Sequence, residues 1–200
     1  MSVSFPPLIL ASKSPRRQEL LKLLGFDFSI ELKDVDESFP EGLTPPEIAV
    51  YISEKKAKAF SSDTKTVITA DTIVALDGEI LGKPINREHA QEMLRKLSGS
   101  THEVFTGVTL VKGSIVRSFY DCTEVTCRTV SENEIDFYID NFKPFDKAGS
   151  YGIQDWWGLV VVQQIRGSYT NVMGLPTEKL YQELLLLFDN LDGDAQGSSF

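Results

Sequence analysis

The sequence has few cysteines, no long apolar run and little positive charge. Its two cysteines, Cys122 and Cys127, have an odd spacing within an expected strand and would face opposite sides, so no disulfide between them is expected. Neither has a histidine near it, which argues against a zinc site. No apolar run approaches the roughly 20 residues that span a bilayer, and the N-terminus lacks the features of a secretory signal. We therefore expect a cytoplasmic protein with reduced thiols and no membrane partner.

The charge balance narrows the possible ligands. The chain has 20 Lys and Arg against 29 Asp and Glu, a formal net charge of -9. Such a chain is a poor general binder of nucleic acid backbones, so no nucleic acid partner is expected. A small polyanionic substrate stays compatible with this charge if cations gather at one place.

Length and composition indicate one domain. The chain has 200 residues, of which 42% are hydrophobic, enough to bury the core of a single domain that can be bilobed. We assign residues 1–188 to this domain. The small, polar residues 189–200 are expected to form a disordered acidic tail.

Helix and strand signals alternate in the first half of the chain, and long antiparallel hairpins follow. Ser14 and Pro15 are typical of a helix start after a buried strand at 8–11. Asp77 and Gly78 are typical of a hairpin turn. Further helices are expected at 44–60, from Asn86 onward, at 131–141 and at 177–188, and further strands at 28–32, 103–128 and 159–165. This pattern predicts an α/β protein with a mixed, partly antiparallel sheet flanked by helices.

The first candidate site lies where the first strand turns into a helix. Ser12 and Ser14 supply hydroxyl groups, Arg16 and Arg17 supply guanidinium groups, and the free N–H groups of a helix N-terminus favour anions. Together these groups would suit a polyphosphate. The same residues also fit an ordinary Ser-Pro helix start with surface arginines.

The second candidate site is a set of charged residues in separate segments. Asp71 ends an apolar strand, where a carboxylate often binds metal or activates water, although it could also form a turn or cap. Glu37 could complete a divalent-metal site with Asp71 or be a solvated loop carboxylate. Lys56 and Lys83, each taken alone, are better explained as solvated lysines. His102 is interpreted as structural, and no Ser-His-Asp triad is found.

A glycine-rich, aromatic segment follows near residue 150. Gly149 and Gly152 would permit unusual backbone torsions or close approach to a ligand, and Gln154 offers an amide that both donates and accepts. A tight turn beside core aromatics explains the segment equally well.

Several segments match one known family in order and spacing. The sequence resembles the Maf (septum formation) family of nucleoside triphosphate pyrophosphatases. The resemblance covers residues 8–188 and rests on "LILASKSPRRQELLKLLG", "ADTIVALDGEILGKP", "MLRKLSGSTHEVFTGV", "DKAGSYGIQ" and "GSYTNVMGLP".

The resemblance implies a fold and a chemistry. The fold would be an α/β fold with a mixed sheet around a deep cleft, related to that of inosine triphosphate pyrophosphatases. A divalent cation (Mg²⁺ or Mn²⁺), a cytoplasmic location and a homodimer are also implied. The activity would be hydrolysis of dTTP and UTP, and of modified pyrimidine triphosphates, to the monophosphate and pyrophosphate. Implied cellular roles are keeping non-standard nucleotides out of nucleic acids and cell-division arrest.

The resemblance also assigns roles to individual residues. Asp71 matches the catalytic aspartate, and Thr72 matches its specificity-associated neighbour. Ser12, Arg16 and Arg17 match the phosphate-side motif, and Glu37, Lys56 and Lys83 match charged positions of the cleft. Gln154 falls where the dTTP/UTP branch carries glutamine. Together with Ser14 from the helix start, the expected substrate-binding and specificity positions are Ser12, Arg16, Arg17, Lys56, Thr72, Lys83 and Gln154.

One departure from the family pattern stands beside Gln154. Trp156 and Trp157 occupy positions where many relatives have small residues, and they are expected to stack on a base or pack at a dimer interface. Two other functions stay open. One is a pyrophosphatase for modified purine nucleotides, and the other is a non-catalytic nucleotide sensor in septum formation.

Overall fold

The computed structural model describes residues 6–60 and 65–196, with the backbone alone for 189–196. Its strands are β1 (Leu8–Leu10), β2 (Phe28–Ile30), β3 (Thr66–Leu76), β4 (Glu79–Leu81), β5 (Thr101–Lys112), β6 (Ile115–Cys127) and β7 (Val162–Arg166). Its helices are α1 (Pro15–Leu23), α2 (Pro45–Lys58), α3 (Arg87–Leu97), α4 (Glu132–Phe142), the 3₁₀ turn η1 (Ala148–Ser150), α5 (Trp156–Val160), α6 (Tyr169–Met173) and α7 (Thr177–Gln196).

The described strands form one seven-stranded sheet in the order β2-β1-β3-β5-β6-β7, with β4 paired to β3. β1 lies parallel to both β2 and β3. All the other pairings are antiparallel. The predicted α/β class with a mixed sheet is therefore confirmed.

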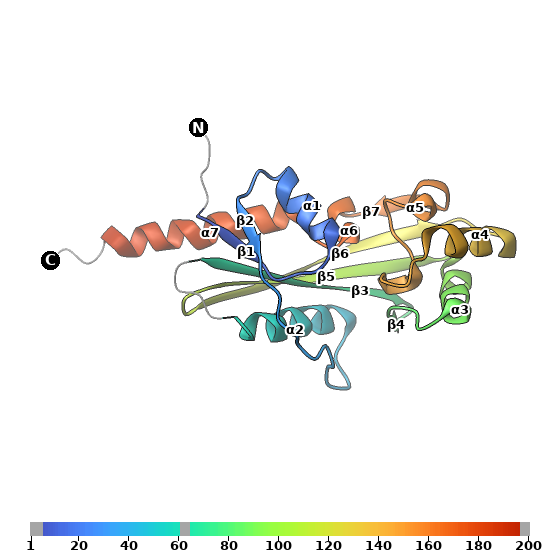
Figure 1. Ribbon diagram of the computed structural model, residues 1–200, viewed down its shortest axis with the longest axis horizontal. Helices are drawn as coiled ribbons and strands as arrows, with labels where there is room; N and C mark the ends of the chain where they lie inside the picture. The colour runs from blue at the N-terminus through green and yellow to red at the C-terminus, as the bar shows by residue number, and fades with distance from the viewer. Residues whose placement is uncertain (1–5, 61–64, 197–200) are drawn as a thin grey trace.

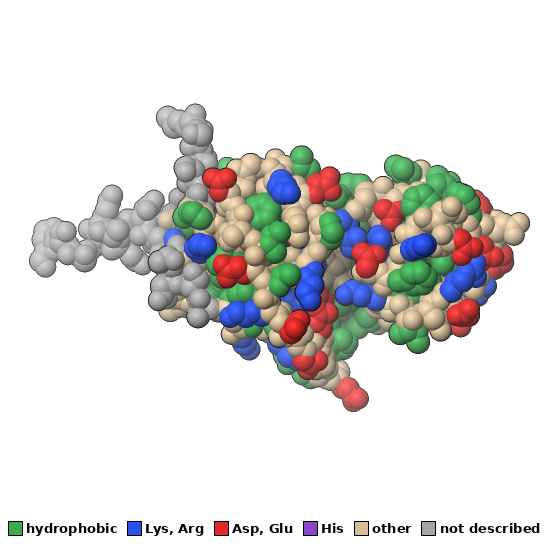
Figure 2. All heavy atoms as spheres, viewed as in Figure 1, with side chains coloured by type: hydrophobic (Ala, Val, Ile, Leu, Met, Phe, Trp, Pro, Cys, Tyr) green, Lys and Arg blue, Asp and Glu red, His purple; other side chains and the backbone are tan. Residues whose placement is uncertain are grey.

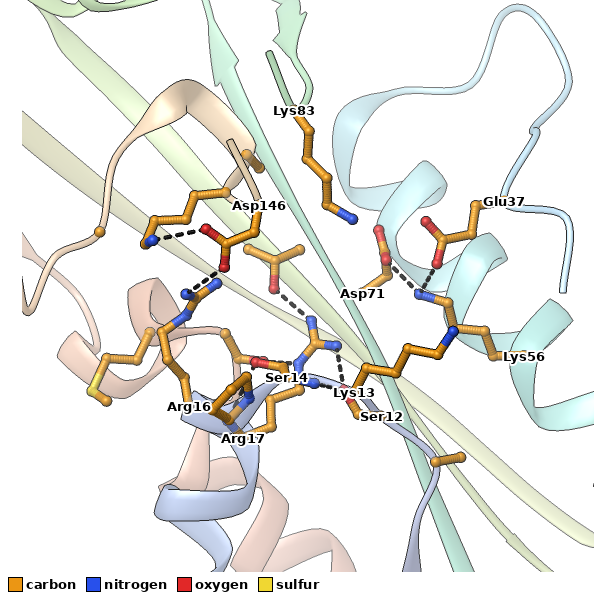
Figure 3. A pocket seen from close by; sticks show the side chains of 18 of the residues that line it. Ser12, Lys13, Ser14, Arg16, Arg17, Glu37, Lys56, Asp71, Lys83 and Asp146 are labelled. Atoms are coloured by element: carbon orange, nitrogen blue, oxygen red, sulfur yellow. Dashed lines mark hydrogen bonds and ion pairs between the residues drawn. The ribbon is translucent and has the colours of Figure 1, made fainter. Parts of the chain in front are cut away.

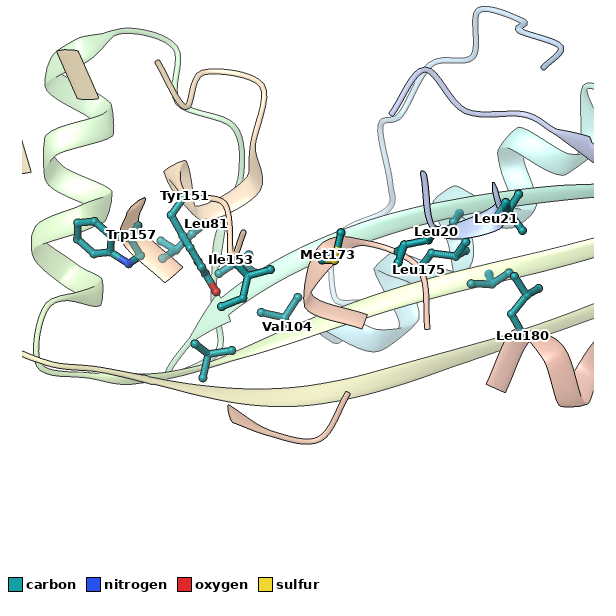
Figure 4. Close-up of a cluster of buried hydrophobic side chains, with 14 of the residues drawn as sticks. Leu20, Leu21, Leu81, Val104, Tyr151, Ile153, Trp157, Met173, Leu175 and Leu180 are labelled. Carbon is teal, nitrogen blue, oxygen red and sulfur yellow. The ribbon is translucent and has the colours of Figure 1, made fainter. Parts of the chain in front are cut away.

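Helices cover both faces of this sheet. α2 lies on one face, and α1 and α7 lie on the other (Figure 1). Side chains alternate between the faces along each strand. Leu8 and Leu10 join the large core under α1 and α7, whereas Ile9 joins the smaller core under α2. Figure 4 shows the large core running from Leu20 and Leu180 at one end to Trp157 at the other.

A gap in strand pairing lies along one edge of β3. β1 pairs with β3 only through Ile68, and β4 pairs with it only from Val74 onward. Among the described residues, the stretch 69–73 between them has no strand partner on that side, so its polar groups are open to side chains and ligands. Asp71 and Thr72 lie in this gap.

The predicted starts of several helices are confirmed. The Ser14 hydroxyl accepts from the Arg17 N–H at 3.5 Å at the start of α1. Thr44 and Glu47 form a capping box that begins α2, and Ser131 begins α4 in the same way. Short polar caps are thus reliable signals where the next residues have helical spacing.

Two predicted boundaries are wrong. The strand expected at 159–165 begins only at Val162, because α5 takes residues 156–160. A short apolar run fits either a strand or a buried helix, and here Trp157 needs the helical position to reach the core. The last helix runs through Gln196, so residues 189–196 of the expected tail are helical. That stretch contains no proline to stop the helix. Residues 197–200 lie outside the described part.

Both cysteines are free, as expected. Within the described residues, no helix combines the length and the apolar character needed to cross a bilayer.

Candidate active site

The gap beside β3 opens into a cavity of about 400 Å³, which is a typical size for a small-molecule site. Figure 2 shows a hollow in the middle of one face with lysine and arginine side chains gathered around it. Among the described residues, seven lysines and arginines and four aspartates and glutamates line the cavity. A chain of net charge -9 therefore concentrates positive charge here.

Arg17 forms the floor of this cavity. Its guanidinium donates to Gly174 O at 2.7 Å, to Ala70 O at 2.9 Å and to Thr72 Oγ1 at 3.0 Å. A fourth hydrogen bond, at 3.2 Å, goes to Ser12 Oγ. Arg17 therefore ties the first loop, the open edge of β3 and the end of α6 together.

Burial changes the acidity of the Arg17 side chain and limits what it can offer a ligand. It lowers the pKa of Arg17, and the nearby charge of Asp71 partly offsets that effect. Four of the five guanidinium N–H groups are used within the protein, so Arg17 has one left for a ligand.

The two hydroxyl groups beside Arg17 differ in what they can offer a ligand. Ser12 Oγ accepts from Arg17 and from the Ser14 N–H, so its own proton is free to donate. Thr72 Oγ1 lies 3.0 Å from Thr106 Oγ1. Because the proton of Thr106 goes to a carbonyl, Thr72 donates to Thr106 and reaches a ligand only as an acceptor.

Two carboxylates converge on the ammonium of Lys56, which α2 brings under the sheet edge. Lys56 Nζ lies 2.7 Å from Asp71 Oδ1 and 2.8 Å from Glu37 Oε1 (Figure 3). Burial alone would raise the pKa of Glu37, but the hydrogen bond and charge of Lys56 outweigh it and lower that pKa. The two oxygens thus frame a single cation-sized position.

The remaining cations approach from the other side of the cavity. Lys83 follows β4 and extends into the same space (Figure 3). Arg16 Nη1 lies 3.6 Å from Asp146 Oδ2, and Lys147 Nζ lies 2.8 Å from Asp146 Oδ1. One carboxylate therefore lies between two cations at this wall.

Gln154 lines the cavity at the end formed by the segment after η1. Its Oε1 is buried and has no hydrogen-bond partner among the described residues. A buried acceptor without a partner is costly, so this oxygen is suited to a ligand N–H. Tyr151 lines the same end, and its hydroxyl lies 2.7 Å from Nε2 of the buried His102. The structural interpretation of His102 is consistent with this contact.

The expectation that Trp157 could stack on a base is wrong. Trp157 is fully buried in the large core, and neither tryptophan is among the residues lining the cavity. Trp156 is half-buried and packs against Phe137 and Tyr138. Both rings support the wall of the cavity from behind.

The structure brings the predicted site residues together from six separate segments. All of them line the one cavity: Ser12, Ser14, Arg16, Arg17, Glu37, Lys56, Asp71, Thr72, Lys83 and Gln154. Their roles stay predictions. Sequence reasoning did not assign Lys13, Asp146, Lys147 or Tyr151 to the site, although they also line the cavity. The signal for the last three was present, because they stand in the segment that contains Gln154.

The site combines cations over a helix N-terminus, a carboxylate pair and an unpaired amide oxygen. These features define a class: an α/β protein that binds a small phosphorylated ligand with a hydrogen-bonding group. The sequence profile described as "Maf-like protein" matches residues 7–187. The chain belongs to the Maf family.

Similar curated proteins carry one activity name. A dTTP/UTP pyrophosphatase of Bacteroides thetaiotaomicron is 52% identical over 88% of this chain and 94% of its own length. A dTTP/UTP pyrophosphatase of Cytophaga hutchinsonii is 50% identical over 91% and 84%. A solved HAM1 protein from Coxiella burnetii aligns with a TM-score of 0.43 and 15% identity, covering 62% of this chain and 73% of that one. That last similarity is too weak to support an argument.

Proposed function

We propose that this protein hydrolyses dTTP and UTP between the α and β phosphorus atoms, giving the monophosphate and pyrophosphate. The observation that carries the proposal is the single cavity that Asp71, the clustered cations and Gln154, whose Oε1 has no partner among the described residues, all line. Relatives that bear the name of that activity are about half identical to this chain, and the alignment covers most of their length.

The phosphate end of the substrate lies against the cations. Arg16 offers a planar fork to phosphate oxygens, and Lys83 adds a point charge in the same cavity. Ser12 donates its free proton. These groups stabilise the negative charge that develops on the pyrophosphate leaving group.

Asp71 serves the attacking water. It lies in the stretch of β3 that has no strand partner on one side, and its side chain is only 14% exposed. There it can orient a water and accept its proton. Before a metal ion binds, Lys56 holds the carboxylate in place from α2 at 2.7 Å.

A divalent cation fits the carboxylate pair. Glu37 and Asp71 converge on one point, now shared with Lys56 Nζ, and Mg²⁺ is usually bound by one or two carboxylates together with phosphate oxygens. The described residues contain no cluster of three or more His, Cys, Asp or Glu that would form a complete protein cage. When bound, Mg²⁺ or Mn²⁺ would neutralise charge on the triphosphate.

Gln154 recognises the base. Uracil and thymine present an N3–H, which the unpaired Oε1 of Gln154 can accept. Cytosine has an unprotonated N3 and an exocyclic amine, so it pairs with Gln154 only if the amide is turned over. With the amide held in one orientation, cytosine leaves the Oε1 unpaired. A site built on hydrogen bonds rejects such mismatches strongly.

The finer biological setting is part of the proposal. We assign a cytoplasmic homodimer that restricts non-standard pyrimidine nucleotides and bears on cell division. Exposed aromatics near α4, such as Phe137 and Phe142, offer apolar surface for a second copy. Equilibrium sedimentation would show twice the chain mass of 22.3 kDa if the dimer forms. The mass of one chain alone would exclude the dimer.

A substrate panel tests the activity. Pyrophosphate release from dTTP, UTP, CTP, GTP and a modified purine triphosphate is measured with and without Mg²⁺. We expect the highest kcat/KM for dTTP and UTP. A preference for the purine would support the alternative enzyme, and binding without turnover would support a nucleotide sensor.

A further inference from the structure

The turn that carries Gln154 is closed by its own backbone. The Asp155 N–H donates to Gly152 O at 3.1 Å, so residues 152–155 form a tight turn with Gln154 inside it. The direction of the Gln154 amide therefore depends on how the two ends of this turn are held.

One hydroxyl group from α4 holds both ends. Tyr138 Oη accepts from the Gly152 N–H at 3.0 Å and lies 3.2 Å from Asp155 Oδ2, to which it donates. Burial raises the pKa of Tyr138, so the hydroxyl keeps its proton for this second bond. The first and last residues of the turn are thus joined through a single side-chain atom.

The ring of Tyr138 is itself fixed. Tyr138 is fully buried, and its ring centroid lies 5.4 Å from Phe142, 6.1 Å from Trp156 and 5.4 Å from Trp157. Three aromatic neighbours leave the hydroxyl little freedom to move away from the turn. The two tryptophans act here as a support.

Gly152 fits this arrangement because it has no side chain. A Cβ at this position would lie 2.4 Å from Asp155 Oδ2, which is far closer than van der Waals contact allows. The glycine lets the Asp155 carboxylate approach the turn closely enough to meet Tyr138.

The same carboxylate continues into a chain of charges. Lys147 Nζ lies 3.7 Å from Asp155 Oδ2 and 2.8 Å from Asp146 Oδ1, and Asp146 Oδ2 lies 3.6 Å from Arg16 Nη1. The side chains of Lys147 and Asp155 are only 12% and 19% exposed, so solvent screens their contact little, whereas the ion pairs of the 62% exposed Asp146 are partly screened. Alternating charges therefore link the base-reading turn to the phosphate-binding arginine.

We propose that Tyr138 and Lys147 are positioning residues for substrate specificity. Tyr138 orients Gln154 through both ends of its turn. Lys147 connects that turn to Asp146 and Arg16, so that base recognition and phosphate binding are set together. This inference rests on the proposed pyrimidine specificity.

The test separates the two residues by two measurements. The ratio of kcat/KM for UTP to that for CTP reports base recognition, and competitive inhibition by inorganic pyrophosphate reports the phosphate end. Tyr138→Phe removes both hydrogen bonds of the hydroxyl, so it should lower the ratio about tenfold or more and leave pyrophosphate inhibition unchanged. Lys147→Met should lower the ratio and also weaken pyrophosphate inhibition by about tenfold or more.

Matched variants guard against a general loss of structure. Tyr120→Phe and Lys96→Met change exposed residues of the same types outside the cavity and should alter neither measurement. Gly152→Ala, which pushes the Asp155 carboxylate away, should reproduce the Tyr138→Phe ratio even if the latter variant folds poorly.

Two outcomes are distinct. A wild-type enzyme without preference for UTP over CTP would refute the proposed base specificity itself. A wild-type preference that survives intact in folded Tyr138→Phe and Gly152→Ala would overturn the positioning role alone.

Discussion

Charged side chains in the cleft are paired with one another before any ligand arrives. Lys56 lies between Asp71 and Glu37, and Asp146 lies between Arg16 and Lys147. In each group of three, the central charge is held by its two partners within a partly buried wall, where an unpaired charge would be costly. A triphosphate with its cation can replace these internal partners by stronger ones.

Asp71 gives the first prediction at the residue scale. Asp71→Asn keeps the shape of the side chain but removes its charge and basicity. General base catalysis contributes roughly 10²–10⁴-fold, so kcat for UTP should fall by about that factor while KM changes little. Steady-state kinetics with Asp77→Asn as the control will check this, because Asp77 lies in the exposed hairpin turn of the same strand. A near wild-type kcat would remove Asp71 from the mechanism.

The second prediction contrasts the adjacent arginines. An ammonium cannot reproduce the four directed bonds of Arg17, so Arg17→Lys leaves buried carbonyl and hydroxyl groups unpaired, at about 1–3 kcal/mol each. The free energy of unfolding, measured with urea, should fall by at least about 2 kcal/mol. Arg16→Lys should lower stability by less than about 1 kcal/mol, because its one ion pair is partly exposed.

Equal stability of the two lysine variants would contradict the structural role of Arg17. Loss of kcat/KM in Arg16→Lys without loss of stability would separate substrate binding from folding.

At the scale of elements, local signals predicted helix starts better than strand limits. Caps such as Ser14 and Ser131 work through neighbouring N–H groups, so the sequence alone can show them. The split of residues 156–166 into α5 and β7 depends on Trp157 reaching the distant core. No local pattern contains that information, and α6 went unpredicted for the same reason.

Gly107 gives a prediction about packing between elements. A Cβ on this β5 residue would lie 2.3 Å from the backbone carbon of Ala49 in α2. Gly107→Ala should push α2 from the sheet, lower the free energy of unfolding by roughly 1–3 kcal/mol and reduce activity, since α2 carries Lys56. Gly82→Ala is the control, because a Cβ at that position would have open space around it. Thermal unfolding of both variants compares their stability. Unchanged stability in Gly107→Ala would mean that this close contact is not tight.

At the scale of the whole molecule, the site exists because separate segments meet at a gap in the sheet. The sequence supplied the residue types, and the family resemblance supplied their grouping. Neither could show that Arg17 is mostly used inside the protein, or that Lys147 connects Asp155 with Asp146. Such pairings depend on tertiary distances between residues far apart in the chain.

Overall stability should depend on pH through His102. Burial lowers the pKa of His102 to about 4 from its ordinary 6.5. The unfolded chain therefore takes up the proton first as pH falls below 6.5, and stability decreases through that window. Between pH 7 and pH 5 the free energy of unfolding should fall by about 2 kcal/mol.

Urea unfolding between pH 7 and pH 5 of wild type, His102→Gln and the control His89→Gln, whose histidine is only partly buried, checks this dependence of the free energy of unfolding on pH. The decrease in the free energy of unfolding from pH 7 to pH 5 should become smaller in His102→Gln and stay unchanged in His89→Gln. Carboxylates with lowered pKa, such as Glu37, titrate below this window. A wild-type slope retained in His102→Gln would assign the effect elsewhere.

The position of bond cleavage is the most direct test of the central claim, that this cleft hydrolyses a pyrimidine nucleoside triphosphate at the α–β bond. UTP is incubated with the enzyme and Mg²⁺, and the initial products are separated by ion-exchange chromatography. The account predicts UMP and pyrophosphate in equal amounts, with release abolished or strongly reduced in Asp71→Asn. UDP and orthophosphate as the first products would contradict it.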